Sequence, residues 1–174
     1  MHLGKSSKLP DITMQQLTLF NLENNHPPVK YIPNFLTPTE AGELYNNCQN
    51  LNWQQNNIKF MGKTMPVPRL ECMYGDAGCS YLYSKSVLLE PIPWTPELLK
   101  IRSRIESQTG YRFNIALCNR YRDGKDSVGW HNDNEPSMGT SPAIASLTLG
   151  STRKFQLKSN NGGRPINYWL EHGS

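Results

Sequence analysis

YRFNIALCNRY, residues 111–121, alternates between apolar and polar side chains with a period of two. This period is typical of a half-buried β-strand, because successive side chains of a strand point to opposite faces. One predicted face carries Phe113, Ile115, Leu117, Asn119 and Tyr121. Its last two residues are polar, and buried polar groups need partners. The strand is therefore predicted to end either at a site that grips a small anion or at an ordinary core tyrosine.

Two helices are predicted before this strand. The first starts at residues 37–40 (TPTE), which combine an N-cap threonine, a proline at the first helical position and a capping glutamate. The second starts at residues 95–97 (TPE) and stops at Gly110. The predicted apolar faces are Leu44, Cys48 and Leu51 in the first helix, and Leu98, Ile101 and Ile105 in the second.

Further strands are predicted at residues 143–150, 153–158 and 168–171, with turns at residues 123–124 and 160–164. Because helices precede most of the strands, the class is α+β, with the strands in a sandwich or barrel. Residues 1–30 are predicted to be a mobile arm, and residues 31–174 to be one domain.

The composition is that of a protein without a membrane anchor. The chain has 174 residues, 37% of them hydrophobic, and a mean hydropathy of −0.60. It shows no apolar run long enough to span a bilayer or to act as a signal peptide. The expected location is cytoplasmic, or nuclear in a eukaryote. The four cysteines form no C-x-x-C pair and are expected to be free thiols with packing roles.

The positive charge is concentrated in the second part of the chain. Residues 1–99 hold 7 basic and 8 acidic side chains, whereas residues 100–174 hold 11 basic and 6 acidic ones, a net charge of +5. A basic field favours a polyanionic partner such as nucleic acid. An ordinary soluble surface explains the total charge of +4 equally well, so charge leaves both interpretations open.

Residues 129–135 (GWHNDNE) hold the candidate metal ligands. His131 and Asp133 are two residues apart, so in an extended segment their side chains point to the same side. Histidine and carboxylate without a thiolate fit the facial triad of non-haem Fe(II) oxygenases, which needs a second histidine from elsewhere. A surface histidine beside a solvated carboxylate is the competing interpretation, because this short motif often occurs by chance.

Residues 119–157 resemble the core of the AlkB family of Fe(II)/2-oxoglutarate-dependent nucleic-acid dealkylases. Residues 68–78 (PRLECMYGDAG), 80–84 (SYLYS), 90–98 (EPIPWTPEL) and 109–114 (TGYRFN) are similar to that family's preceding motifs. The resemblance covers roughly residues 55–174, with the motifs in the family's order. It implies a double-stranded β-helix (jelly-roll) core with N-terminal helices packed on it.

The resemblance also implies a reaction and its cofactors. His131 and Asp133 match iron ligands, and Asn119 and Tyr121 match residues that bind 2-oxoglutarate. Fe(II), O₂ and 2-oxoglutarate would oxidise an N-methyl group on a base of DNA or RNA. The products would be formaldehyde, succinate, CO₂ and the repaired base, so the implied role is an enzyme of DNA alkylation repair.

Six further residues match substrate contacts of the family. They are Tyr81, Tyr83, Glu135, Arg69, Phe60 and Met61. Tyr81 and Tyr83 match a lid that stacks on the flipped base. Glu135 matches a carboxylate that contacts the damaged base, and Arg69 matches a basic residue near the nucleic acid. Phe60 and Met61 match a short apolar finger that enters the base stack. The plainer interpretations are core tyrosines for the lid and a buried hairpin for the finger.

Two departures from the family pattern qualify the resemblance. Many relatives have aspartate where this chain has Asn134. Only 41 residues follow Asp133, too few to reach the family's second iron-ligand histidine and the arginine that binds 2-oxoglutarate. His172 does not fall at the ligand position. The chain is therefore expected to be a C-terminally truncated member, lacking the last strands and poorly active, whereas a complete member is expected to be a monomer.

Two other functions compete with that of an active dealkylase. One is a catalytically incomplete nucleic-acid-binding relative of the same fold. The other is a related hydroxylase of proteins or small molecules, against which Tyr81, Tyr83 and the basic second part of the chain argue.

Overall fold

The computed structural model describes residues 2–4, 28–60, 62–79, 81–83, 87–89, 91–133, 139 and 141–174. The chain divides into two compact units, which are taken in turn. The sheet unit comprises Met1–Lys8 and Asn47–Ser146, and the hairpin unit comprises Leu9–Asn46 and Leu147–Ser174. Neither helix in the described part of the chain has the length and apolar composition needed to cross a bilayer.

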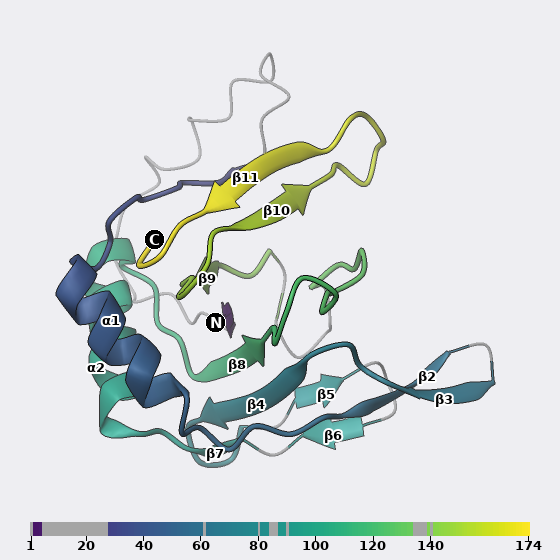
Figure 1. The fold of residues 1–174 in the computed structure, drawn as a ribbon, viewed down its shortest axis with the longest axis horizontal. Helices are drawn as coiled ribbons and strands as arrows, with labels where there is room; N and C mark the ends of the chain where they lie inside the picture. Colours follow the sequence, from purple (N-terminus) through teal and green to yellow (C-terminus); the bar gives the residue numbers. More distant parts are fainter. Residues whose placement is uncertain are drawn as a thin grey trace. The chain divides into compact units, whose positions relative to one another are not determined.

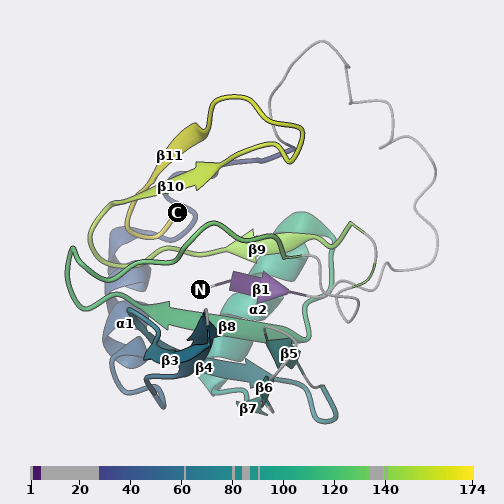
Figure 2. The same ribbon diagram turned by 90° about the vertical axis from the view of Figure 1, so that its right-hand side faces the viewer.

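A five-stranded sheet forms the centre of the sheet unit (Figure 2). Its strands, in spatial order, are β7 (Ile92–Pro93), β4 (Leu70–Gly75), β8 (Ile115–Arg120), β1 (His2–Gly4) and β9 (Ile144–Ser146). β4 and β8 are antiparallel over six residue pairs, with Glu71 opposite Asn119 and Cys72 opposite Cys118. β7 runs parallel to β4, and β1 is antiparallel to both of its neighbours.

Helix α2 (Pro96–Thr109) is defined by local signals at both ends, as predicted. The Thr95 side chain accepts a hydrogen bond from the Leu98 N–H at 3.3 Å, which satisfies one of the free donors of the first turn. Gly110 ends the helix with a φ of 73°, a conformation that glycine adopts without steric cost. Leu98, Ile101 and Ile105 are its buried residues, as the apolar spacing predicts.

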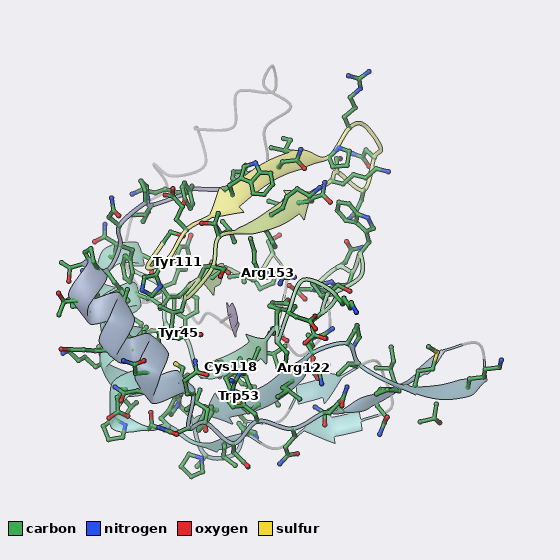
Figure 3. The ribbon with its side chains drawn as sticks, viewed as in Figure 1. Tyr45, Trp53, Tyr111, Cys118, Arg122 and Arg153 are labelled. Carbon is green, nitrogen blue, oxygen red and sulfur yellow. The ribbon has the colours of Figure 1, made fainter. Side chains whose placement is uncertain are left out.

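One face of β4 and β8 packs into the hydrophobic core. The buried cluster consists of Cys72, Tyr74, Leu98 and Cys118, and partly buried Leu51, Trp53, Ile92 and Trp94 pack against it. Trp53 and Cys118 are labelled beside these strands in Figure 3. Because side chains alternate along a strand, Glu71, Leu117 and Asn119 belong to the opposite face. That face is the one available for a site.

Two of the motifs that carry the family resemblance meet at the end of β4. Asp76 follows β4, and its Oδ1 accepts hydrogen bonds from Trp94 Nε1 at 2.9 Å and from Arg102 Nη1 at 2.7 Å. The Arg102 guanidinium also lies over the Trp94 ring, 5.1 Å from its centroid. These contacts join the sheet to α2, so the YGD and PIPW motifs have a structural role.

Two hairpins belong to the sheet unit. β2 (Asn57–Phe60) pairs with β3 (Lys63–Pro66), and β5 (Tyr81–Tyr83) pairs with β6 (Val87–Leu89). The β2–β3 hairpin extends beyond the start of β4 (Figure 1), and all four residues of β3 are exposed.

The hairpin unit contains strands β10 (Arg153–Leu157) and β11 (Ile166–Leu170) and the start of helix α1 (Pro38–Cys48). The predicted capping box is present, because the Thr37 N–H donates to Glu40 Oε2 at 2.9 Å and the Glu40 N–H donates to Thr37 Oγ1 at 3.3 Å. Gly173 packs against α1 with a φ of 79°, and a Cβ on it would lie 3.0 Å from that of Ala41.

The structure corrects several predicted boundaries. β8 begins at Ile115 rather than at residue 111, because the Phe113 N–H donates to the Glu106 side chain at 2.9 Å instead of to a strand. β9 is shorter than predicted, because Thr148 exchanges backbone hydrogen bonds with residues 173 and 174. Leu51 lies beyond the end of α1. The mainly antiparallel sheets and two helices agree with the α+β class.

The N-terminal arm is corrected at its first residues. His2–Gly4 form β1 and pair with β8 on one side and β9 on the other. The prediction failed because a three-residue strand has no detectable period, and its pairing partners lie more than a hundred residues away. Residues 5–27 lie outside the described part of the chain.

Candidate functional site

Asn119 and Arg69 are joined by a hydrogen bond on the face of the sheet opposite α2. Asn119 is the fifth residue of β8, and Arg69 is the residue before β4. Arg69 Nε donates to Asn119 Oδ1 at 2.9 Å. The two residues are fifty positions apart in sequence, and the antiparallel register of β4 and β8 brings them together.

Arg69, which the family resemblance places near the nucleic acid, is buried. It is only 5% exposed. Its Nη2 lies 2.5 Å from Glu71 Oε1, and its Nη1 donates to the backbone oxygen of Ser127 at 3.3 Å. A buried guanidinium needs a counter-ion, and Glu71 supplies one from the same face of β4. The guanidinium is therefore engaged within the protein.

Glu71 and Ser127 are functional candidates that the sequence reasoning missed. Glu71 is 3% exposed, and its other oxygen accepts from Asn56 Nδ2 at 3.1 Å. The Ser127 N–H donates to the Pro68 carbonyl at 2.9 Å, so backbone and side chain both fasten this loop to residues 68–69. The spacing of Arg69 and Glu71 was the available signal, because opposite charges two residues apart share a strand face.

A tight turn connects β8 to the loop that carries the candidate metal ligands. Asp126 is buried, and it accepts from the Arg122 backbone N–H and Nε at 2.8 Å each and from Nη2 at 2.9 Å. These hydrogen bonds raise the pKa of the Arg122 guanidinium. Arg122 lies just beyond the end of β8 (Figure 3), where the predicted turn at residues 123–124 begins.

His131 and Asp133 point toward each other, as their spacing predicts. His131 Nε2 lies 3.4 Å from Asp133 Oδ1. His131 Nδ1 lies 2.8 Å from the Gly129 backbone oxygen. A carbonyl only accepts, so Nδ1 carries the hydrogen and Nε2 is the free ring nitrogen when the imidazole is neutral. This backbone contact orients the ring, as is common for metal-binding histidines.

The chemistry of this pair fits a divalent metal ion. With Nδ1 as the donor, the Nε2 lone pair and an oxygen of the Asp133 carboxylate face each other, and a cation between them could accept both lone pairs. Two ligand atoms that bind one metal ion at right angles to each other lie roughly 3 Å apart. The observed 3.4 Å is close to that spacing. His131 and Asp133 would therefore hold Fe(II).

No third metal-binding side chain joins this pair among the residues that the structure describes. His172, in the hairpin unit, is engaged elsewhere, because its Nδ1 accepts from the Gly150 N–H at 2.9 Å. Its ring also makes an edge contact with Tyr45, with ring centroids 6.3 Å apart. That His172 is not an iron ligand stays a prediction.

Tyr121 and Trp130 lie near the candidate ligands in the sequence. Tyr121 directly follows β8 and is half-buried. Trp130 is 63% exposed and precedes His131, and Val128 is exposed too. Trp130 belongs to the GWHNDNE motif, but no local pattern indicates that its ring faces solvent. An exposed indole beside the His131–Asp133 pair is a surface on which a flat ligand can stack.

The remaining predicted substrate residues are only partly within the described chain. Tyr81 and Tyr83 occupy alternate positions of β5, opposite Leu89 and Val87. Phe60 ends β2 opposite Lys63, at the tip of the exposed hairpin. Met61 and Glu135 lie outside the described residues, as do the side chains of Phe60, Tyr81 and Tyr83. Their contacts with substrate stay predictions.

The four cysteines are free thiols. Cys72 and Cys118 belong to the core cluster rather than to the His131–Asp133 pair. Burial raises the pKa of Cys48 to about 11, and the thiol of Cys118 adds to this effect. The hydrogen bond with Cys118, together with burial, raises the pKa of Cys72. The thiols of Cys48 and Cys72 stay protonated at neutral pH, and a neutral thiol is a poor metal ligand. The predicted packing roles of Cys72 and Cys118 are confirmed.

Residues 28–174 match the family model of the 2OG-Fe(II) oxygenase superfamily. The chain is 46% identical over 128 residues to the alpha-ketoglutarate-dependent dioxygenase alkB homolog 3 of Rattus norvegicus, covering 72% of this chain and 42% of that protein. The identity to the Homo sapiens protein of the same name is 43%, over 72% of this chain and 44% of that protein. The DNA oxidative demethylase ALKBH2 of Mus musculus is 39% identical over 67% of this chain and 52% of its own length.

The chain belongs to the 2OG-Fe(II) oxygenase superfamily, the dioxygenase class that its site chemistry also fits. Within that class its relatives are alkB homologues, which confirms the resemblance to the AlkB family and implies Fe(II) and 2-oxoglutarate as cofactors. The chain spans less than half of the length of the alkB homolog 3 proteins that it matches.

Proposed function

We propose that this chain carries the Fe(II) and 2-oxoglutarate site of an oxidative dealkylase that demethylates alkylated bases in DNA or RNA. The observation that carries the proposal is the His131–Asp133 pair. A backbone carbonyl orients the imidazole so that its free nitrogen and the carboxylate are 3.4 Å apart. The names of the relatives, a dioxygenase and a DNA oxidative demethylase, support the reaction type.

Each site residue has a role that its chemistry suits. Bound Fe(II) and 2-oxoglutarate would, together with O₂, supply the oxidising power for hydroxylation of an N-methyl group, and the resulting hydroxymethyl group would leave as formaldehyde. His131 and Asp133 would hold the metal and leave positions open for the cosubstrate. Asn119 and Tyr121 would bind 2-oxoglutarate through an amide N–H and a phenol hydroxyl. The half-buried position of Tyr121 suits this role.

The proposed substrate contacts follow from the need to reach an atom inside the base stack. An enzyme that modifies a base extrudes it and holds it between flat side chains. Tyr81 and Tyr83 would form that lid, with Glu135 at the damaged base and Phe60–Met61 as a finger. The exposure of all four β3 residues supports the finger over a buried hairpin. Trp130, which is exposed, adds a second aromatic surface.

The proposed fold is the double-stranded β-helix of the superfamily, and the antiparallel pairing of β4 with β8 and of β10 with β11 is compatible with it. We further propose that residues 31–174 form this domain, and that the protein acts as a monomer in the cytoplasm, or in the nucleus of a eukaryote.

The test is turnover with a methylated oligonucleotide. Purified protein with Fe(II), O₂, 2-oxoglutarate and a 1-methyladenine oligonucleotide is expected to release formaldehyde, succinate and CO₂. Asp133→Ala should abolish both, whereas the unmethylated oligonucleotide should give no formaldehyde.

Two outcomes would favour other functions. Oligonucleotide binding by a chain that binds neither Mn(II) nor 2-oxoglutarate would indicate an incomplete nucleic-acid-binding relative. Mn(II) and 2-oxoglutarate binding without affinity for any oligonucleotide would indicate a hydroxylase of proteins or small molecules.

A further inference from the structure

Arg69 connects two parts of the candidate site that are separate in the sequence. Its guanidinium contacts the Asn119 side chain on β8 and the Ser127 backbone in the loop that leads to His131. Arg69 itself is 5% exposed, so these contacts are shielded from water. The position matters because Asn119 is a proposed cosubstrate residue and His131 a proposed metal ligand.

The shape of the guanidinium makes the two contacts interdependent. Arginine presents five N–H groups in one rigid plane. Nε donates to Asn119 Oδ1 at 2.9 Å, while Nη1 donates to Ser127 O at 3.3 Å. A shift of either partner therefore requires the plane to move relative to the other partner. The third contact, from Nη2 to Glu71 Oε1 at 2.5 Å, fixes the plane against β4.

Glu71 and Asn56 hold the guanidinium in place. Glu71 is 3% exposed and shares the face of Arg69, so it neutralises a charge that would otherwise be buried alone. Asn56 donates to the second Glu71 oxygen at 3.1 Å and thereby orients the carboxylate. The network thus extends from Asn56 through Glu71 to Arg69, and from there to the site.

The hydrogen bond from Arg69 also decides which end of the Asn119 amide faces a ligand. Its Oδ1 accepts from Arg69, so the NH₂ group is the end left to a ligand. An amide donor is what a carboxylate requires, and 2-oxoglutarate carries two carboxylates. Without Arg69 the amide is free to rotate and present its oxygen, which would repel the cosubstrate.

The loop toward His131 is held by the same short segment. The Ser127 N–H donates to Pro68 O at 2.9 Å, and the Ser127 carbonyl accepts from Arg69. Both hydrogen bonds lie four residues before His131. Residues 68–69 therefore anchor the loop on both sides of the Ser127 peptide.

We propose that Arg69 is a positioning residue that orients Asn119 toward 2-oxoglutarate and anchors the loop of His131, and that it does not bind nucleic acid. The proposal rests on the proposed Fe(II)/2-oxoglutarate function. It goes beyond that function in assigning a specific task to a buried Arg69–Glu71 pair that touches neither substrate nor cofactor.

The first test is cosubstrate affinity, measured by calorimetry of this protein with Mn(II) and 2-oxoglutarate. Arg69→Gln should weaken 2-oxoglutarate binding by about 10–100-fold, the usual effect of removing a residue that orients a ligand. Arg69→Lys should not restore it, because an ammonium cannot reproduce the planar fork. Arg104→Gln is the matched control, since it removes the same charge from an exposed position of α2 and should leave the affinity unchanged.

The second test separates positioning from direct binding of nucleic acid. If Arg69 bound a phosphate group, Arg69→Gln would lower the slope of log affinity against log salt by about 0.9 for duplex DNA. We expect the slope to be the same as in the wild type. A lowered slope together with unchanged 2-oxoglutarate affinity would overturn the proposal and return Arg69 to the nucleic-acid interface.

The third measurement needs no metal, cosubstrate or nucleic acid. The Nε–H of Arg69 should be a slowly exchanging NMR signal, and Asn119→Ala should shift it and speed its exchange. Rapid exchange in a wild-type protein that binds 2-oxoglutarate would overturn the positioning role alone. A wild type that binds neither Mn(II) nor 2-oxoglutarate would overturn the proposed function, and the cofactor role of Arg69 with it.

Discussion

His131 depends on a contact that a sequence pattern does not display, the backbone oxygen of Gly129 at 2.8 Å from Nδ1. That contact selects the ring nitrogen that faces Asp133, and a ligand with the wrong tautomer could not bind the metal. The motif therefore gives the ligand types, whereas the loop conformation gives their orientation.

We expect His131→Ala to abolish Mn(II) binding and turnover, because it removes one of the two proposed metal ligands. Asn132→Ala is the matched control, since Asn132 lies between the ligands and is exposed. Calorimetric titration with Mn(II) measures the effect. Retained Mn(II) affinity in His131→Ala would remove His131 from the site.

Cys48 gives a prediction for the alkaline range. Burial raises its pKa from 9.0 to about 11, so the neutral thiol is favoured in the folded state. The corresponding stability is fully present below pH 9.0 and is lost as the pH rises through about 11. Urea unfolding at pH 8 and at pH 10.5 should show a smaller loss of stability in Cys48→Ala than in the wild type. An equal loss in both would contradict the raised pKa.

At the scale of elements, the β2–β3 hairpin carries the proposed finger. β3 is exposed along its length, and Met65 is 48% exposed. A single two-stranded hairpin is only marginally stable alone. Exposed apolar residues on such a hairpin can mark an interaction site. The sequence places Phe60 and Met61 between Lys59 and Lys63, and apolar residues flanked by cations suit insertion between base steps.

Replacement of Phe60 and Met61 by serine is therefore expected to impair repair of duplex DNA more than repair of a single strand. The duplex requires unstacking, which costs a few kcal/mol, whereas a single strand does not. The measurement is formaldehyde release from both substrates, with Met65→Ser on β3 as the control. Equal losses on the two substrates would indicate that the pair only stabilises the fold.

At the scale of the whole molecule, the first residues of the chain complete the central sheet. Leu3 pairs with Ala116 of β8 and with Ala145 of β9. A strand that has partners on both sides leaves no free edge, whereas its removal would expose the edges of both neighbours.

Leu3→Pro is expected to destabilise the protein, because proline removes a backbone donor and is poorly tolerated inside a sheet. The backbone carbonyl that loses its N–H partner should lower the free energy of unfolding by about 1–3 kcal/mol. For a chain of this size each kcal/mol lowers Tm by roughly 2–4 °C. Leu3→Val keeps the donor and serves as control. An unchanged Tm in Leu3→Pro would show that β1 contributes nothing to the sheet.

The sequence by itself determined the features that depend on neighbours along the chain. The two helix starts, the stop at Gly110 and the faces of β8 were predicted because capping and side-chain periodicity act within a few residues. The mutual approach of His131 and Asp133 follows from the same local geometry. The family resemblance rests on these motifs and on their order.

Only the tertiary structure decided what joins residues far apart in sequence. Arg69 meets Asn119 because β4 and β8 pair in one particular register, and β1 enters between β8 and β9. No local pattern contains a strand's register with a distant partner, and a shift by one residue would turn every side chain to the other face. That register buries the Arg69 side chain against Asn119, a contact that the motif alone does not contain.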